Sequence, residues 1–539
     1  MPSRVQSPFR EQTDMGFWDK SLRIFNSLCE NATQSVRQLA QQTGLSKSSV
    51  HRLQQAMERR NGHPESWLWE TEDGRRWLTR LVVATLYTFG LKRGVGLETL
   101  SKFFTHLHLE TQVGCSPSAL GGVMQALEAA ILETTAAWEH EGVATGEMRE
   151  IIGAVDETFL QRMMLVFMDL VSGYLVFEEV AEDRSCATWQ ALVEERLKVL
   201  GTEVLYLVSD RAKALIQLAE KGVECLSMPD FFHVVHDIIK SYSLAIGRHV
   251  RQAHQELAKA TETLTRLPAA HDAPEAQALV EAKQAEVQHW KEVQGTYRQH
   301  LETLSLTLHP FRLSDSTPQT ADQVASRLHA VVEAIEALVR HQQLPARHPT
   351  MKKVRKQIPA LAALVDCWWQ GVRQDLEPFL LSPLWRQWVH ECLLPLVYWE
   401  CQIAHTRCTR RKTKLAQALE AVRAAFDTHA ITRQLAPRVL AEWQAWATDR
   451  VHIFQRASSA VEGRNGFLSQ MQHNHRGLPK RRYKVWTVLH NFDCRAADGT
   501  TPASRFFRRP FPTLFETVLA QIEVLPRPRQ RKHEVALNH

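Results

Sequence analysis

Short β-rich segments between residues 150 and 228 set the first limit on how this chain can fold. Val, Ile, Leu, Met, Phe and Tyr dominate them, and helical patterns at 186–200 and 211–222 separate the later ones. The segments are 150–159, 163–173, 174–183, 202–210 and 223–228. The sequence Val-Ser-Gly-Tyr offers a hairpin turn between the second and the third. This order predicts a mixed five-stranded α/β core with flanking helices.

Helical patterns surround this core. Within the first seventy residues, the segment 35–57 has the spacing of a helix-turn-helix: Ala40 is small where two helices approach, and Gly44 supplies the turn. Val50 and Leu53 would pack the second helix onto the first. The polar residues left exposed for DNA are Ser46, Lys47, Ser48, Ser49, His51 and Arg52. An ordinary helical hairpin is the alternative.

A chain of 539 residues is too long for a single core, so we expect several domains. The predicted divisions follow the changes of pattern. They are 1–75, the helix-turn-helix domain; 76–147, a second helical DNA-binding or dimerisation region; 148–237, the first part of the α/β core; 238–450, an all-helical insertion; 451–500, the second part of the core; and 501–539, a basic-aromatic C-terminal tail. Segment 94–132 resembles a second, looser helix-turn-helix.

The insertion begins with a heptad seam. Its apolar positions are Ile246, Val250, Ala253, Leu257, Ala260, Leu264 and Leu267, and a returning helix carries Val280, Val287, Trp290, Tyr297, Leu301, Leu304 and Leu308. This pattern predicts an antiparallel helical hairpin.

The chain has a formal net charge of +6, and its basic residues concentrate in three blocks, at 406–414, 476–484 and 505–534. Blocks of one sign suit a polyanion such as DNA, and a solvated surface is the alternative. Nine cysteines without regular pairs favour a reducing compartment. The N-terminus lacks an apolar signal core, and no apolar run is long enough for a membrane span. We expect a soluble intracellular protein with no membrane partner. No phosphate-binding glycine loop is present, so a nucleotide cofactor is not expected.

Three acidic residues share one setting, the end of an apolar element before a turn or small residues: Asp156, Asp210 and Glu462. The first and fourth strands of such a sheet can lie side by side, which would bring Asp156 to Asp210. A helix laid against that edge can supply Glu462. Three carboxylates at one point suit Mg²⁺ or Mn²⁺.

The chain resembles the DDE transposases of bacterial insertion sequences, whose catalytic domain has the ribonuclease H-like fold. The matching pieces are "AVDETF", "YLVSDRAKAL" and "SSAVEGRNGFLS". The spacing of Asp230 and His233 in "PDFFHVVHD" also matches the Cys-or-Asp, two residues, His motif of many such enzymes. A helical insertion before the catalytic Glu is a further feature common in this family.

The resemblance implies a DNA transposase of the bacterial cytoplasm, associated with the nucleoid. Asp156, Asp210 and Glu462 would hold two Mg²⁺ or Mn²⁺ ions per active site. Water would attack a phosphodiester at the element's end, and the freed 3′-hydroxyl would attack target DNA. The helix-turn-helix would recognise the terminal inverted repeats. Because two ends are processed together, a homodimer or larger synaptic assembly is implied, and the insertion and the basic tail would clamp DNA and join subunits.

Several residues allow a second interpretation. Glu157 should point to the opposite face from Asp156, Asp169 fits a turn residue, and Asp210 could be only a helix cap. Asp230 and His233 could be structural, and His236 is a weaker candidate than His233.

The second half of the chain holds further alternatives. Glu442 and Asp449 are alternative candidates for the third acidic residue, in place of Glu462. Arg464 and Asn465 could reach a phosphate or a flipped base, or they could lie at the surface. Cys401, His405 and Cys408 span too much of a straight helix for one zinc ion.

Two other functions remain open at this point. The chain could be a transposase-derived DNA-binding regulator that has lost catalysis. It could also be a ribonuclease H-like nuclease that cuts without joining.

Overall fold

The computed structural model describes residues 16–144, 146, 148–266, 273–345, 347–475, 481–522 and 524–528. These residues form two compact units. The first unit holds the chain up to residue 146, the short segment 159–162 and the chain from residue 465 onward; the second holds 148–158 and 163–464. Among the described residues, no helix has both the length and the apolar character needed to cross a bilayer.

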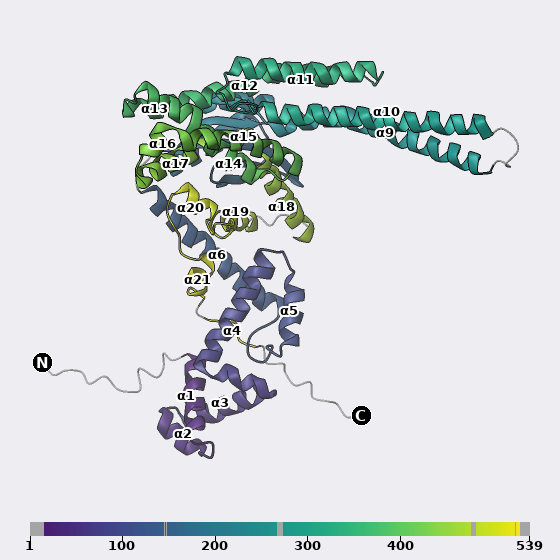
Figure 1. Cartoon of the computed structure of the whole chain (residues 1–539). Coiled ribbons are helices and arrows are strands. Elements are labelled where there is room, and N and C mark those ends of the chain that lie inside the picture. Colours follow the sequence, from purple (N-terminus) through teal and green to yellow (C-terminus); the bar gives the residue numbers. More distant parts are fainter. Residues whose placement is uncertain are drawn as a thin grey trace. The chain divides into compact units, whose positions relative to one another are not determined.

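The first unit begins with a three-helix domain made of α1 (Phe17–Glu30), α2 (Val36–Thr43) and α3 (Lys47–Arg60), as Figure 1 shows. Its small core contains Ile24, Leu39, Val50 and Leu53, as the helix-turn-helix pattern predicted for the last two. Gly44 ends α2 with a φ of 72°, a conformation that glycine adopts at little cost. The predicted helix-turn-helix is confirmed.

Further helices complete the first unit. They are η1 (Pro64–Glu70), α4 (Glu72–Thr85), η2 (Leu86–Leu91), α5 (Leu97–His106), α6 (Pro117–Val143), α19 (Arg482–Phe492), α20 (Pro502–Phe506) and α21 (Leu514–Leu519). The loop between α5 and α6 runs from 107 to 116, whereas a helix-turn-helix has a turn of about three or four residues. The expectation of a second helix-turn-helix over 94–132 is therefore wrong.

The C-terminal segment 501–522 is part of the core of the first unit rather than a free tail. Phe506 and Phe507 are buried. The ring of Phe511 lies 5.8 Å from that of Trp138 on α6 and 5.2 Å from that of Phe492 on α19. Because these aromatic rings are packed inside the unit, they are not available to clamp DNA. Residues 529–539 of the predicted tail lie outside the described residues.

The second unit is built on a five-stranded sheet with the order β3-β2-β1-β4-β5. The strands are β1 (Arg149–Leu160), β2 (Arg162–Asp169), β3 (Leu175–Ala181), β4 (Thr202–Ser209) and β5 (Leu226–Pro229). β4 is parallel to both β1 and β5, and β2 is antiparallel to β3, so the sheet is mixed as predicted. The flanking elements are α7 (Cys186–Leu200), α8 (Lys213–Gln217) and η3 (Leu218–Gly222). The assignment to the ribonuclease H-like fold stays a prediction.

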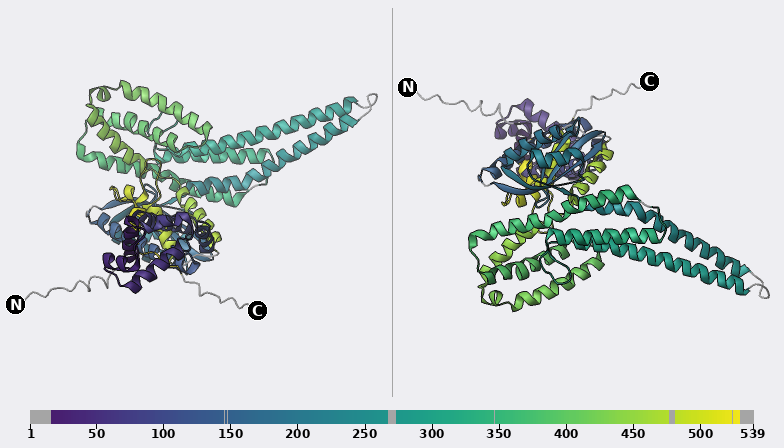
Figure 2. Two further views of the ribbon diagram at one scale, coloured as in Figure 1. Left: turned by 90° about the horizontal axis from the view of Figure 1, so that it is seen from below. Right: turned by 90° about the horizontal axis from the view of Figure 1, so that it is seen from above.

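A long antiparallel hairpin opens the helical insertion. It consists of α9 (Phe231–Arg266) and α10 (Ala273–Thr307), and Figure 2 shows it extending past the neighbouring helices. The ring of His249 stacks on that of Trp290 at 4.2 Å, and the Tyr242 and Tyr297 rings meet at 6.5 Å. The predicted hairpin is confirmed, although α9 begins seven residues before the expected start of the insertion at 238. Leu267 of the predicted seam lies outside the described residues.

The remaining helices of the insertion form one core with the sheet. They are α11 (Ala321–His341), α12 (His348–Leu376), η4 (Glu377–Phe379), α13 (Pro383–Trp388), η5 (Val389–Leu393), α14 (Leu394–His405), α15 (Thr409–Thr428), α16 (Ala430–Gln434) and α17 (Pro437–His452). One cluster of buried side chains joins Ile152, Tyr206 and Val208 of the sheet to Phe311 and Trp368 of the insertion. The sheet therefore packs against the insertion. α18 (Ser459–His475) then begins in the second unit and continues into the first after Arg464.

Candidate functional site

Asp156 and Asp210 lie just beyond the last paired positions of two adjacent strands. β1 and β4 run parallel, and Ala154 pairs with Val208. Since each Asp follows its paired residue by two positions, both carboxylates stand at the same carboxyl-terminal edge of the sheet. The prediction that the first and fourth strands lie side by side is confirmed.

Asp210 stabilises a turn rather than capping the helix that follows. Its Oδ1 accepts a hydrogen bond from the Ala212 N–H at 2.8 Å, and Arg211 between them has a φ of 62°. α8 begins at Lys213, with Ala212 as its N-cap and no side-chain cap. This corrects the expectation of a helix cap and leaves Asp210 exposed at the sheet edge.

The carboxyl group of Asp156 lies among other charged groups. Its pKa is raised to about 6, mainly by burial and also by the nearby carboxylates of Glu462 and Asp210. The Glu157 N–H, which donates to Asp156 Oδ1 at 2.9 Å, and the charge of His233 act in the opposite direction. All three predicted acids therefore contribute to one electrostatic environment.

His233 links Asp230 to Glu462. Its Nδ1 lies 2.8 Å from Oδ2 of Asp230, and its Nε2 lies 3.4 Å from Oε1 of Glu462. The hydrogen bond with Asp230 raises the pKa of His233 to about 8, although burial opposes this shift. Because that pKa lies above neutrality, His233 is mainly cationic at pH 7. The sequence left open whether this pair is structural; the structure brings His233 into contact with Glu462.

Asp230 is held in place by three donors. Burial acts to raise its pKa, but hydrogen bonds from His233, from the Ser458 hydroxyl and from the Phe232 N–H outweigh burial and lower it. An ionised, fully bonded Asp230 fixes the orientation of the His233 ring. Ser458 is the first residue of the matched piece "SSAVEGRNGFLS", but no sequence signal linked it to Asp230, which lies more than two hundred residues away along the chain.

A set of hydrogen bonds anchors the chain just before α18 to the sheet. The Tyr206 hydroxyl of β4 donates to the Ile453 carbonyl at 2.6 Å and accepts from the Gln455 N–H at 2.8 Å. The Arg456 guanidinium donates to backbone carbonyls of the insertion, and the Arg456 carbonyl accepts from the Phe231 N–H at 3.0 Å. These bonds determine where α18 starts and so where Glu462 lies.

Arg464, two residues beyond Glu462 on α18, forms a buried ion pair with Glu178 of β3. Its Nε and one terminal nitrogen lie 2.7 and 2.8 Å from the two Glu178 oxygens. The sequence allowed either a contact with a phosphate or a flipped base or a surface position; the surface position is wrong, because Arg464 is buried. A bidentate pair of this kind fixes α18 against the sheet. Asn465 follows, half-buried on the same helix.

Two other acidic residues near Asp156, Glu157 and Asp169, have partners of their own. Glu157 pairs with Arg184 at 3.0 Å, as expected if it points away from Asp156. Asp169 is buried and accepts hydrogen bonds from the Ile152 N–H at 3.1 Å and the Ser172 N–H at 2.9 Å, which confirms it as a turn residue.

The more distant rivals are placed differently. Glu442 and Asp449 are both exposed on α17, and Glu442 pairs with Arg438 at 3.2 Å. Neither is among the charges that shift the pKa of Asp156. The His236 ring stacks on Phe232, with 5.9 Å between ring centroids.

A small pocket adjoins the carboxylates. Its lining residues are Asp210, Asp230, His233, Val234, Asp237, Lys353 and Gln357. Lys353 comes from α12 and lies 2.9 Å from Asp237, with its side chain 56% exposed. It places a cation in the same pocket as Asp210 and Asp230. Sequence reasoning missed it, because nothing in the α12 pattern links Lys353 to residue 210.

Three carboxylates are suitable ligands for a hard divalent cation, but their oxygen atoms are not gathered at one point in this structure. Among the described residues, the carboxylate oxygens of Asp156, Asp210 and Glu462 do not all lie within 4.8 Å of one another. Their repulsion contributes to the raised pKa of Asp156, and a cation would relieve it.

The helix-turn-helix presents a polar face. Ser46 is the N-cap of α3, and its hydroxyl accepts from the Ser49 N–H at 3.2 Å. Ser49 is half-buried, and the other predicted DNA-contacting residues, Ser46, Lys47, Ser48, His51 and Arg52, are exposed. The N-terminal half of α3 is thus free to enter a major groove.

Comparisons with known families agree with this domain. Residues 19–61 match the IclR helix-turn-helix domain, and residues 389–534 match a family of unknown function, DUF6399. No curated protein matches the chain. The chain therefore carries a helix-turn-helix DNA-binding domain at its N-terminus, followed by a mixed sheet and a largely helical remainder, and this domain supports binding to double-stranded DNA.

Proposed function

We propose that this protein is a DNA transposase that cuts the ends of its element and joins them to target DNA. One observation carries the proposal. Asp156 and Asp210 each stand two positions beyond the last residue pair of the parallel strands β1 and β4, and the charge of Glu462, from a helix some 250 positions after Asp210, shifts the pKa of Asp156.

Asp156, Asp210 and Glu462 would hold Mg²⁺ or Mn²⁺, two ions per site. These ions would activate the attacking oxygen and stabilise the leaving oxygen of an in-line phosphodiester displacement. Asp156 must lose its proton to act as a ligand. Since its pKa is about 6, metal-dependent activity should rise as the pH increases from 6 to 8.

Cationic groups beside the acids suit a phosphate-bearing substrate. His233 is held by Asp230 and faces Glu462, and Lys353 lines the adjoining pocket. Both could contact the DNA backbone next to the scissile phosphate. In this proposal the helix-turn-helix selects the terminal inverted repeats, and a homodimer or larger synaptic assembly pairs the two ends.

The test uses labelled DNA duplexes with the inverted repeats that flank the gene, incubated with Mg²⁺. Wild type is compared with Asp156→Asn, Asp210→Asn and Glu462→Gln. We expect each change to reduce cleavage by at least about 100-fold while DNA affinity stays within about threefold. Glu442→Gln, which alters an exposed carboxylate on α17, is the matched control and should cleave normally.

The outcomes separate the candidate functions. Unchanged cleavage in a variant removes that residue from the site. A wild-type protein that binds but never cuts would be a regulator, and one that cuts without joining would be a nuclease.

A further inference from the structure

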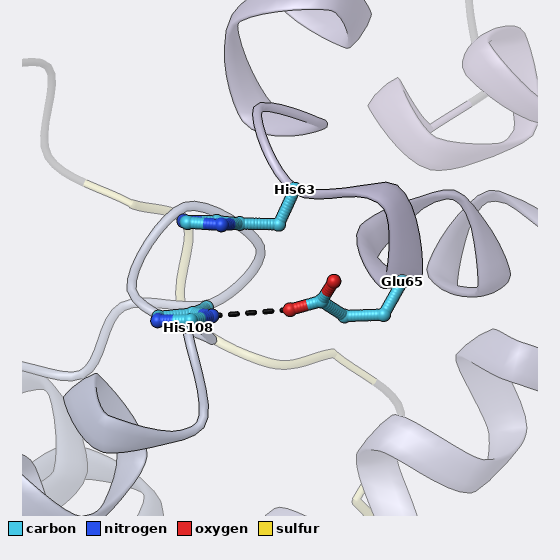
Figure 3. A group of neighbouring side chains, drawn as sticks. All are labelled: His63, Glu65 and His108. Atoms are coloured by element: carbon cyan, nitrogen blue, oxygen red, sulfur yellow. Dashed lines mark hydrogen bonds and ion pairs between the residues drawn. The ribbon is translucent and has the colours of Figure 1, made fainter.

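Two histidines and a glutamate come together in the first unit, far from the carboxylates in the sequence. His63 and Glu65 lie at the start of η1, and His108 lies in the loop after α5 (Figure 3). The two imidazole rings stack with 3.8 Å between centroids, and His108 Nδ1 lies 3.1 Å from Glu65 Oε1. One potential ligand atom from each residue lies within 4.8 Å of the other two.

A buried polar network fixes the two segments that carry these side chains. The Arg60 guanidinium forms an ion pair with Glu70, and Asn61 donates to the same carboxylate at 2.8 Å. Gln112 Nε2 bonds to Asn61 Oδ1 at 2.8 Å and to the Arg60 carbonyl at 3.1 Å. The Thr111 hydroxyl also donates to the Arg60 carbonyl, at 2.8 Å. The backbone on both sides of the cluster is therefore held together before any ligand binds.

The atoms that these three side chains offer indicate which kind of metal ion they can bind. Two imidazole nitrogens and one carboxylate oxygen suit Zn²⁺ and related transition metals, whereas Mg²⁺ prefers oxygen ligands alone. Glu65 is an exposed carboxylate, which is ionised at neutral pH and can bind a cation directly. The stacked rings must rotate apart to point at one ion, and exposure of His108 and Glu65, 45% and 62%, leaves room for this.

We propose that His63, Glu65 and His108 form a binding site for one Zn²⁺-class ion, with water completing the coordination. The helix-turn-helix match ends at residue 61, two positions before His63. An ion held here would tie the end of that DNA-binding domain to the loop 107–116 between α5 and α6. The site is separate from the proposed catalytic carboxylates and uses a different metal class.

The test is a titration of the metal-free full-length protein with Zn²⁺, and with Co²⁺ as a spectroscopic probe, in excess Mg²⁺. The variants are His63→Gln, Glu65→Gln and His108→Asn; asparagine is chosen because residue 108 has a φ of 54°, which asparagine tolerates. We expect wild type to bind one tight equivalent and to melt at a higher temperature with Zn²⁺. Each variant should bind at least about tenfold more weakly and lose the thermal shift.

Two controls keep the result specific. His405→Gln removes the neighbour of Cys401, and Asp156→Asn alters the proposed catalytic site; both should keep the tight equivalent. Glu65→Gln changes an exposed side chain, so equal melting of this variant and wild type in EDTA shows that the fold is intact. Unchanged Zn²⁺ affinity in all three cluster variants would overturn the site, as would its loss in His405→Gln.

Discussion

At the scale of single residues, the central feature is a balance of charge around Asp156. Burial and two nearby carboxylates disfavour its ionised form, and His233 is the cation that offsets them. His233 in turn depends on Asp230, which is fully hydrogen-bonded. This arrangement is costly without a further cation, as expected of a site prepared for ligand binding rather than for stability.

Asp156→Asn should stabilise the protein at pH 7.5. The pKa of Asp156 is raised from 3.8 to about 6, so the folded state holds this proton more tightly, and ionisation removes stability as the pH rises through that window. Removing the charge should increase the free energy of unfolding by about 1–2 kcal/mol at pH 7.5 and have little effect at pH 4. Urea unfolding at both values checks this, with Glu442→Gln as control. A loss of stability at pH 7.5 would contradict it.

His233 should make the stability of the wild-type protein fall between pH 6.5 and 8. A raised histidine pKa means that protonation stabilises the fold; this contribution is complete below pH 6.5 and disappears as the pH passes 8. His233→Gln keeps a donor for Asp230 but cannot titrate. Its unfolding midpoints should therefore vary less over this range. Parallel profiles for the two proteins would show that His233 is not the group responsible.

At the scale of elements, α18 is positioned by contacts with two strands of the sheet, β4 and β3. Its start follows the segment bonded to Tyr206, and its Arg464 pairs with Glu178 of β3. Both partners of this ion pair are almost fully buried, so neither charge can be left alone without a large cost. The position of Glu462 is thus maintained by residues outside the group of three carboxylates.

Changing one partner of the Arg464–Glu178 pair should destabilise the protein more than changing both. Arg464→Met or Glu178→Gln alone removes one charge of a buried ion pair and should cost about 3–5 kcal/mol of unfolding free energy. The double change Arg464→Met with Glu178→Met replaces both charges by apolar side chains and should cost less than either single change. Chemical denaturation of the three variants measures this. Additive losses would mean that the pair does not act as a unit.

At the scale of the whole molecule, the chain combines a DNA-binding domain with a sheet that carries an acidic edge and with a large helical insertion. The α9–α10 hairpin pairs residues in a regular antiparallel register, with His249 opposite Trp290 and Glu256 bonded to Lys283. Its outer part can therefore be shortened without changing the packing near the sheet.

Replacing residues 254–285 by a short Gly-Ser turn should keep the sheet and the helix-turn-helix intact. The cut joins two neighbouring points of the hairpin, because the register places residue 253 opposite residue 286. If the hairpin joins subunits, single-end binding and cleavage should stay within about threefold of wild type. Paired-end assemblies should disappear, as measured by light scattering with end DNA. Unchanged assembly would assign this role to another part of the chain.

The sequence by itself determined the local elements. Strand runs, the hairpin at 171–174, the heptad seam and the Gly44 turn were predictable because periodicity and turn chemistry act between near neighbours. The adjacency of β1 and β4 also followed, since few topologies suit that order of elements. Hence Asp156 and Asp210 could be placed together from the sequence.

Only the tertiary structure decided which distant side chains meet. Arg464 pairs with Glu178, and His233 contacts Glu462. The aromatic residues of the C-terminal segment pack in the core of the first unit. The cluster of His63, Glu65 and His108 has no regular spacing that could have revealed it. Such meetings depend on packing between elements far apart along the chain, where small differences in buried area and charge pairing select one arrangement among many, and no local pattern encodes that choice.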